Sequence, residues 1–286
     1  FSTSIPFIMK RLLLLPVLLL LGLVGLYAQQ IDTITIHSQM GHDIKNIVIL
    51  PQGYAESDTR YPVVYLLHGH GDNYTCWINI KPELPQIASQ YGFIVVCPDG
   101  KRSWYWDSPL HKDMQFETYI SDELVHYIDS HYRTVADRRA RAIAGLSMGG
   151  HGAMWNAIRH RDVFGAAGST SGGVDIRPFP NNWNMKEQLG EQAAHPENWE
   201  SHTVINLVPS LNDGDLALII DCGLDDFFLE VNRNFHQSLI DHHIKHDYIE
   251  RPGAHNRFYW NNSIDYQLLF FHKFFTQPAA KEEATR

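Results

Sequence analysis

Short apolar runs alternate with segments of helical spacing along most of this chain. Several of the runs are continuous in Val, Ile and Leu, which is typical of strands covered on both faces of a parallel sheet. In 119–131 the apolar residues Ile120, Leu124 and Ile128 recur instead at the spacing of one helix face. This alternation predicts an α/β fold with a mainly parallel central sheet and helices on both faces.

The first two apolar segments are separated by Gly41-His42-Asp43, which predicts an N-terminal antiparallel hairpin. The predicted strands are 31–37, 44–50, 62–67, 93–97, 141–144, 164–169, 216–222 and 248–250. The predicted helices are 84–91, 119–131, 151–158, 232–241 and 264–275. Between 174 and 215 the pattern breaks down, and so long an irregular insertion is typical of a lid or binding wall.

Length, composition and charge indicate which class of protein this is. The chain has 286 residues, 44% hydrophobic and 19% charged, which fits one globular domain with a large core. A net charge of −9 without any basic cluster disfavours nucleic acid or an anionic membrane surface as a partner.

The N-terminal stretch resembles a targeting signal. Met9-Lys10-Arg11 precedes an apolar run that ends at Ala28, which is typical of a secretory leader. We therefore expect upstream residues and a signal peptide in 1–28, one domain in 29–276, a frayed tail in 277–286, and a secreted or periplasmic location. A retained membrane anchor is the alternative.

The chain has three cysteines, Cys76, Cys97 and Cys222. Cys97 and Cys222 end apolar strands and are expected to be buried thiols. Cys76 has the alternative of pairing with one of them in an oxidising compartment. Their spacing does not match a zinc site.

Gly145-Leu146-Ser147-Met148-Gly149 lies between a predicted strand and a predicted helix. This is the context in which the G-x-S-x-G pattern forms a nucleophile elbow, a tight turn that exposes the serine hydroxyl. A glycine-rich turn without chemistry is the competing interpretation. A base, an acid and oxyanion donors elsewhere in the chain decide between the two.

In proteins with such an elbow the acid and the histidine follow the serine along the chain. Asp225 and Asp226 follow a strand, at the end where loops face a ligand crevice. The residues themselves leave the choice between these two carboxylates open. His255 follows the last predicted strand and is the expected base.

A second backbone donor is expected after the strand 62–67, where the sequence is His68-Gly69-His70-Gly71. Glycine lets the main chain approach a carbonyl oxygen closely. We predict an oxyanion hole formed by the backbone N–H groups of His70 and Met148. This role does not require the side chains of His68 or His70.

Four segments together resemble the esterase D group of α/β-hydrolases. They are 67–73, 145–153, 222–226 and 253–260. The group includes acetyl, feruloyl and tributyrin esterases, S-formylglutathione hydrolases and mycolyltransferases. The resemblance implies an α/β-hydrolase catalytic domain in 29–276, with Asp226 as the acid of a Ser147–His255–Asp226 triad.

The resemblance implies a serine carboxylesterase acting on short-chain acyl or aryl esters, free or linked to polysaccharide. An acyltransferase and an S-formylglutathione hydrolase-like thioesterase are the alternatives, and a noncatalytic binding protein is a further class. We expect no metal and no organic cofactor, since His242, His243 and His246 lack the carboxylates that would complete a metal site. Trp106, Trp183 and Trp260 are candidates to line the substrate pocket. The oligomeric state stays open.

Overall fold

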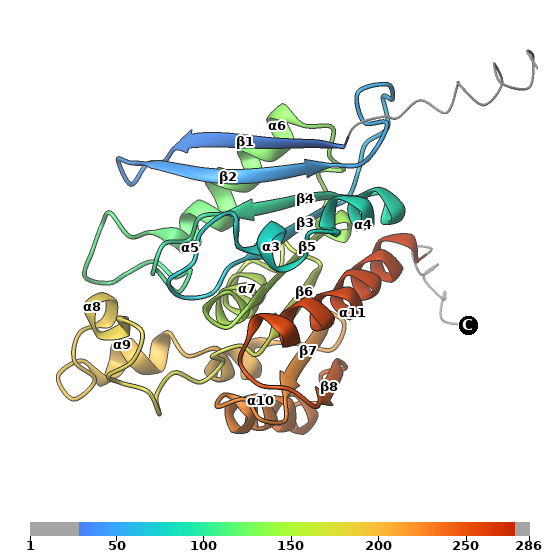
Figure 1. The fold of residues 1–286 in the computed structure, drawn as a ribbon. Helices are drawn as coiled ribbons and strands as arrows, with labels where there is room; N and C mark the ends of the chain where they lie inside the picture. The colour runs from blue at the N-terminus through green and yellow to red at the C-terminus, as the bar shows by residue number, and fades with distance from the viewer. Residues whose placement is uncertain (1–28, 278–286) are drawn as a thin grey trace, which may run out of the picture.

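The computed structural model describes residues 29–277, which are built around an eight-stranded sheet of order β1-β2-β4-β3-β5-β6-β7-β8 (Figure 1). The strands are β1 (Gln30–His37), β2 (Asp43–Leu50), β3 (Val63–Leu67), β4 (Ile94–Pro98), β5 (Arg141–Leu146), β6 (Ala166–Thr170), β7 (Ala217–Gly223) and β8 (Asp247–Arg251). β2 pairs antiparallel with β1 and with β4, and every later pair is parallel. The predicted mainly parallel sheet with an N-terminal hairpin is confirmed.

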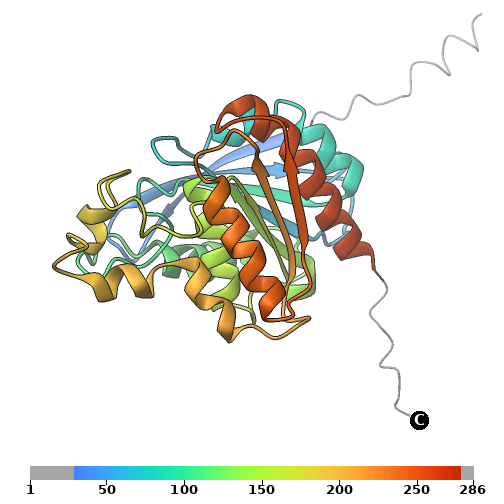
Figure 2. The ribbon, with the colours of Figure 1, turned by 90° about the horizontal axis from the view of Figure 1, so that it is seen from below.

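The central strands are apolar along their length because side chains on both faces are buried. On β3, Val63, Tyr65 and Leu67 join one hydrophobic cluster, whereas Val64 and Leu66 join another. One face is covered by α3 (Cys76–Ile80), α4 (Leu84–Tyr91) and α11 (Arg257–Thr276), and the other by α6 (Val125–His131), α7 (Met148–Arg159) and α10 (Leu229–Asp241). Figure 2 shows α10 and α11 on opposite sides of β7 and β8.

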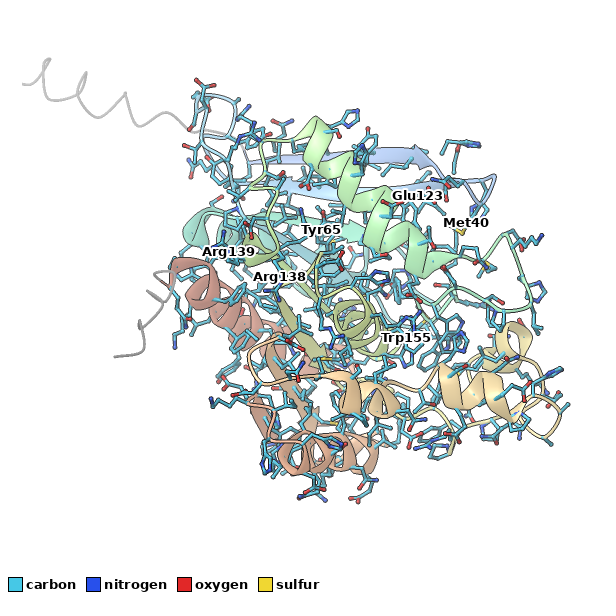
Figure 3. All side chains as sticks on the ribbon, turned by 180° about the vertical axis from the view of Figure 1, so that it is seen from behind. Met40, Tyr65, Glu123, Arg138, Arg139 and Trp155 are labelled. Carbon is cyan, nitrogen blue, oxygen red and sulfur yellow. The ribbon has the colours of Figure 1, made fainter. Side chains whose placement is uncertain are left out.

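The view from behind shows the face covered by α6 and α7, with Tyr65 and Trp155 labelled (Figure 3). The Trp155 indole N–H donates to the buried carboxylate of Glu117 over 2.7 Å, and Arg159 donates to the same carboxylate over 2.7 Å. Glu117 lies in α5 (Phe116–Thr118). This carboxylate therefore ties α5 to α7, the helix that begins at the predicted serine elbow.

Two predicted helices differ most from the structure. The single helix expected over 119–131 is a π-helical segment, η2 (Tyr119–Leu124), followed by α6. The last helix begins at Arg257 rather than at 264, because the Asn256 side chain accepts the N–H groups of Phe258 and Tyr259 at 3.0 and 3.2 Å. Asparagine is a favoured N-cap residue, so Asn256 was a sequence signal for this helix start that apolar periodicity alone did not reveal.

The insertion 174–215 contains α8 (Met185–Leu189), α9 (Pro196–Ser201) and the 3-10 segment η4 (Val204–Ser210), and another 3-10 turn, η3 (Arg138–Ala140), precedes β5. α8 and α9 lie beyond the end of the sheet at which the parallel strands finish (Figure 1). The insertion therefore stands next to the loops that carry the candidate residues.

All three cysteines are buried and free, so the disulfide alternative is not formed. Burial raises the pKa of each thiol, which keeps it protonated and unreactive at neutral pH. Within residues 29–277 no helix has the length and apolarity needed to cross a bilayer. The predicted leader and residues 278–286 of the predicted tail lie outside the described residues.

Candidate active site

Ser147 lies in a sharp turn between β5 and α7, with backbone angles of φ 56° and ψ −118°. This left-handed conformation is strained for a residue with a side chain. The turn also brings backbone segments together, since a Cβ on Gly145 would lie 2.3 Å from the Gly149 oxygen, and one on Gly149 would lie 2.3 Å from the Leu67 oxygen. The two glycines of the motif are therefore required by backbone contact, as the elbow interpretation predicts.

Three loops at the same end of the sheet bring a serine, a histidine and an aspartate together. His255 Nε2 lies 2.9 Å from Ser147 Oγ, and His255 Nδ1 lies 2.9 Å from Asp226 Oδ2. A carboxylate only accepts hydrogen bonds, so Nδ1 carries the imidazole proton and Nε2 is left to accept the serine proton. The geometry thus joins the three predicted residues in one hydrogen-bonded chain.

Burial separates the two aspartates that the residues alone could not rank. The Asp226 side chain is fully buried, and its Oδ1 also accepts the Phe228 N–H at 2.8 Å. Asp225 is exposed, and its backbone N–H donates to the Gly253 oxygen at 2.9 Å. Asp225 therefore joins the two loops through its main chain, while Asp226 faces the imidazole.

The His68–Gly71 loop lies directly against the elbow. A Cβ on Gly69 would lie 2.6 Å from Leu146 Cδ1 and 3.5 Å from Ser147 Cβ, so a larger residue here would have to displace the Leu146 side chain. Among residues 29–277, the backbone N–H groups of His70 and Met148 have no hydrogen-bond partner. The Met148 N–H is one of the unpaired donors at the start of α7. Both groups are free to receive a ligand oxygen.

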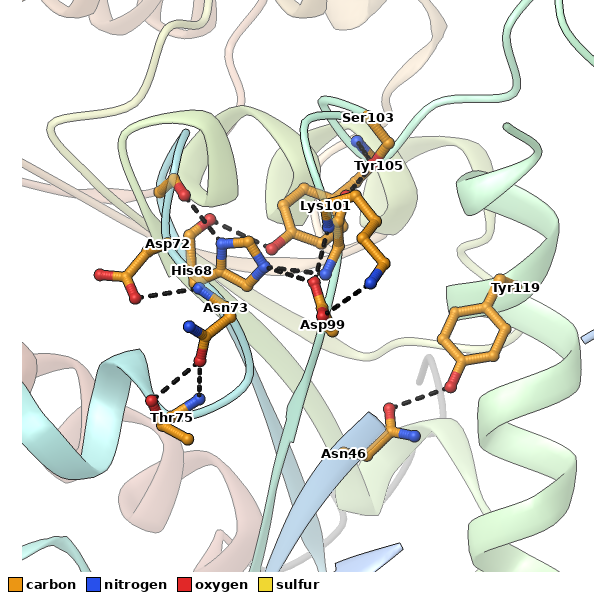
Figure 4. A network of polar contacts seen from close by, with 12 residues as sticks. Asn46, His68, Asp72, Asn73, Thr75, Asp99, Lys101, Ser103, Tyr105 and Tyr119 are labelled. Carbon is orange, nitrogen blue, oxygen red and sulfur yellow. Dashed lines mark hydrogen bonds and ion pairs between the residues drawn. The ribbon is translucent and has the colours of Figure 1, made fainter. Parts of the chain in front are cut away.

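The His68 imidazole fixes the peptide that carries the His70 N–H (Figure 4). The Gly100 N–H donates to His68 Nε2 at 2.8 Å, so the proton must lie on Nδ1, which donates to the Gly69 oxygen at 2.8 Å. In a trans peptide the carbonyl and the following N–H point in opposite directions. By holding the Gly69 carbonyl, His68 directs the His70 N–H the other way.

Sequence reasoning missed this role of the His68 side chain, because it depends on the backbone N–H of Gly100, which lies in another loop. The Tyr105 hydroxyl adds a bond to the His68 carbonyl at 3.1 Å. Lys101 and Asp99 complete the network beside it, with 3.2 Å between Lys101 Nζ and Asp99 Oδ2. The sequence showed only a histidine beside a glycine, and its complete burial is visible only in the structure.

The insertion contacts the same loop. His70 Nε2 lies 3.1 Å from Asn184 Oδ1, an atom that only accepts, so Nε2 carries the proton. Burial, foremost among the causes, lowers the pKa of His70, which keeps the ring neutral at pH 7. The insertion therefore helps to hold one wall of the site.

The three tryptophans predicted to line a substrate pocket are placed differently from one another. Trp106 is completely buried, stacked on Trp104 at 5.8 Å between ring centroids, so it lies in the core and not on a surface that a substrate reaches. Trp183 is partly exposed, and Trp260 lies with its ring perpendicular to that of His255 at 5.1 Å. Phe227, which sequence reasoning missed, is 53% exposed beside His255.

Comparison with known proteins identifies the family to which this chain belongs. A family described as "Putative esterase" matches residues 37–271. An esterase of Mycobacterium tuberculosis is 32% identical over 133 residues, which are 46% of this chain and 29% of that protein. An endo-1,4-beta-xylanase/feruloyl esterase of Xylanibacter ruminicola is 37% identical over 139 residues, 44% of this chain and 19% of that protein. The chain thus spans less than a third of the length of either relative.

The solved structure of a ferulic acid esterase superposes with a TM-score of 0.74 at 27% identity, covering 87% of this chain and all of that one. The family match extends from the last residue of β1 into α11, so it spans nearly the whole described domain. The fold is that of the α/β-hydrolases. The chain belongs to the Esterase family.

Proposed function

We propose that this protein is a serine carboxylesterase that hydrolyses short-chain acyl or aryl esters through an acyl-enzyme. One observation carries the proposal: the Ser147 hydroxyl, the His255 imidazole and the Asp226 carboxylate form a continuous chain with 2.9 Å at each link. This arrangement suits the transfer of a serine proton to a histidine base.

In the proposed reaction His255 Nε2 takes the Ser147 proton as the serine oxygen bonds to the ester carbonyl carbon. The carbonyl oxygen becomes an oxyanion and accepts the N–H groups of His70 and Met148. His255 then gives its proton to the departing alkoxide, and the alcohol leaves an acyl group on Ser147. Water repeats the sequence and releases the acid, with Asp226 stabilising the imidazolium in both halves.

The surroundings of the proposed triad favour substrates with an aromatic part. The partly exposed ring of Trp260 contacts His255, and the partly exposed ring of Trp183 contacts Phe227, which lies on His255. These rings offer apolar faces to an aryl group. The similarity to a ferulic acid esterase supports the same class. If the predicted leader directs export, polysaccharide-linked esters are the substrates that such an enzyme would meet.

A panel of esters tests the proposal. We expect hydrolysis of p-nitrophenyl acetate, p-nitrophenyl butyrate and methyl ferulate, and release of ferulate from feruloylated arabinoxylan, each followed by chromatography. Transfer of the acyl group to an added sugar in preference to water would support the acyltransferase alternative instead. Activity confined to S-formylglutathione would support the thioesterase alternative, and inactivity on the whole panel would contradict the proposal.

A His68→Ala substitution is expected to lower kcat by about 10- to 100-fold with little change in KM. The Gly69–His70 peptide would lose the bond that orients it, so one oxyanion donor would be misaligned only where charge develops. Steady-state kinetics on p-nitrophenyl acetate measures the effect, and circular dichroism checks that the variant is folded. Tyr105→Phe is the matched control, because it removes the bond to the His68 carbonyl but keeps the imidazole, and its loss should be much smaller. A kcat within twofold of the parent value in the folded His68 variant would refute this role.

A further inference from the structure

Three aromatic rings surround the imidazole of His255. The Phe227 ring lies 4.2 Å from it between centroids, tilted by 36°, so it covers one face of the imidazole. Trp260 at 5.1 Å and Phe228 at 5.5 Å stand nearly perpendicular to it. The His255 side chain is only 14% exposed, so these rings replace much of the water around it.

A second contact fixes Phe227 from its other side. The Trp183 ring is nearly parallel to it, at 5.5 Å between centroids and an angle of 20°. Trp183 belongs to the insertion and has a left-handed φ of 48°. Phe227 therefore lies between the insertion and the proposed base, although it is 53% exposed. An exposed phenylalanine held in a three-ring stack is better explained by a role in the site than by core packing.

The face of an aromatic ring attracts a cation whose centre lies within about 6 Å of the ring centroid. In the proposed mechanism His255 becomes an imidazolium each time it accepts a proton from serine or water. Asp226 compensates this charge on the Nδ1 side only. A ring over the imidazole face would stabilise the cation without competing for either nitrogen.

We propose that Phe227 is a positioning residue that acts through His255, stabilising its imidazolium form by cation–π contact while Trp183 holds the phenyl ring in place. This inference rests on the proposed esterase function, because it assigns Phe227 a part in the proton transfer of that reaction. It concerns the stabilisation of the base and not the binding of substrate.

The charged groups near His255 are the same with and without Phe227, so the contribution of its ring to the imidazolium can be measured separately. Asp226 is the ionisable partner bonded to the ring, and it is present in every variant considered. Asp225 is exposed, with its main chain turned toward Gly253. Arg257, two residues after the histidine, donates to the Asn79 oxygen at 2.7 Å and so extends toward α3. Replacing Phe227 changes none of these charges.

The test compares Phe227→Leu with the parent enzyme on p-nitrophenyl acetate across pH. Leucine keeps an apolar cover but has no π face, so we expect the acidic limb of kcat/KM to move about 0.3 to 1 pH unit lower. The plateau of kcat should fall about 2- to 10-fold. Phe227→Tyr should restore both values, because the phenol ring keeps the π face and its hydroxyl can reach solvent.

Phe258→Leu is the matched control. Phe258 is 82% exposed at the start of α11, and among the described residues the aromatic rings that pair with His255 are those of Phe227, Phe228 and Trp260. The acidic limb of the kcat/KM profile of the Phe258→Leu variant should coincide with that of the parent enzyme. A Phe227→Leu variant that changes KM alone would show a substrate contact, and a uniform loss of rate with an unmoved limb would show packing alone. Either result, or no change, would overturn the inference.

Nuclear magnetic resonance separates a failure of this inference from a failure of the proposed function. The chain has 17 histidines, and the His255 ring signals are assigned as those missing from a His255→Gln spectrum. The titration midpoint of these signals should be lower in Phe227→Leu than in the parent protein, whether or not any ester is hydrolysed. An inactive parent protein with the expected shift would contradict only the esterase, and equal midpoints would contradict only the role of Phe227.

Discussion

Replacing Ser147 with alanine is expected to lower kcat by about 10⁴- to 10⁶-fold without unfolding the protein. The substitution removes the proposed nucleophile, and no other hydroxyl bonded to His255 occurs among the residues that the structure describes. Alanine at φ 56° is no more strained than serine, so stability should change little. Hydrolysis of p-nitrophenyl butyrate and labelling by a fluorophosphonate measure the loss.

Ser171→Ala is the control for this prediction. Ser171 is buried and has a φ of 50°, and its Oγ has no hydrogen-bond partner within residues 29–277. The two variants therefore remove the same group from residues with similar positive φ values, but only Ser147 is bonded to the imidazole. We expect normal labelling of Ser171→Ala and none of Ser147→Ala. Near-normal hydrolysis by a folded Ser147→Ala variant would contradict the proposed mechanism.

Replacing Asp226 with asparagine should lower kcat by about 10³- to 10⁴-fold. An amide can donate to Nδ1, which would shift the imidazole proton to Nε2 and prevent it from accepting the serine proton. The oxygen that accepts the Phe228 N–H remains available in asparagine, so the loop should keep its conformation. Steady-state kinetics at neutral pH gives the magnitude.

Asp225→Asn is the matched control, with the same chemical change one residue earlier. Its side chain is exposed and its contribution to the loops is a backbone bond, so we expect activity within about twofold of the parent value. If Asp225→Asn lost activity and Asp226→Asn kept it, the assignment of the acid would be reversed.

Most of the fold could be predicted because its elements depend on neighbours in the chain. The continuous apolar strands, the alternation with helices and the N-terminal hairpin all follow from local pattern. Each end of an observed strand lies within about two residues of the predicted end. The helix at 119–131 was less predictable. Its apolar spacing fits one helix face, and nothing local indicated the π-helical turns of η2.

Several features of the candidate site could not be read from neighbouring residues. Trp106 is an aromatic residue in a predicted loop, as a pocket residue would be, yet it is packed inside the core. The imidazole of His68 binds main-chain atoms of a loop more than thirty positions away, at Gly100. The Phe227 ring is held in position by the Trp183 ring, and Trp183 lies in a segment whose sequence has no periodic pattern.

The sequence by itself determined the class of fold, the elbow at Ser147 and the loop in which the base had to lie. A tight turn between a strand and a helix needs its glycines within the turn, so that signal is contiguous in the chain. Only the tertiary structure decided, on physical grounds, that Asp226 and not Asp225 faces His255, and which aromatic rings surround that imidazole. Those contacts join loops far apart in sequence, and their geometry is set by how the strands pair and the helices pack.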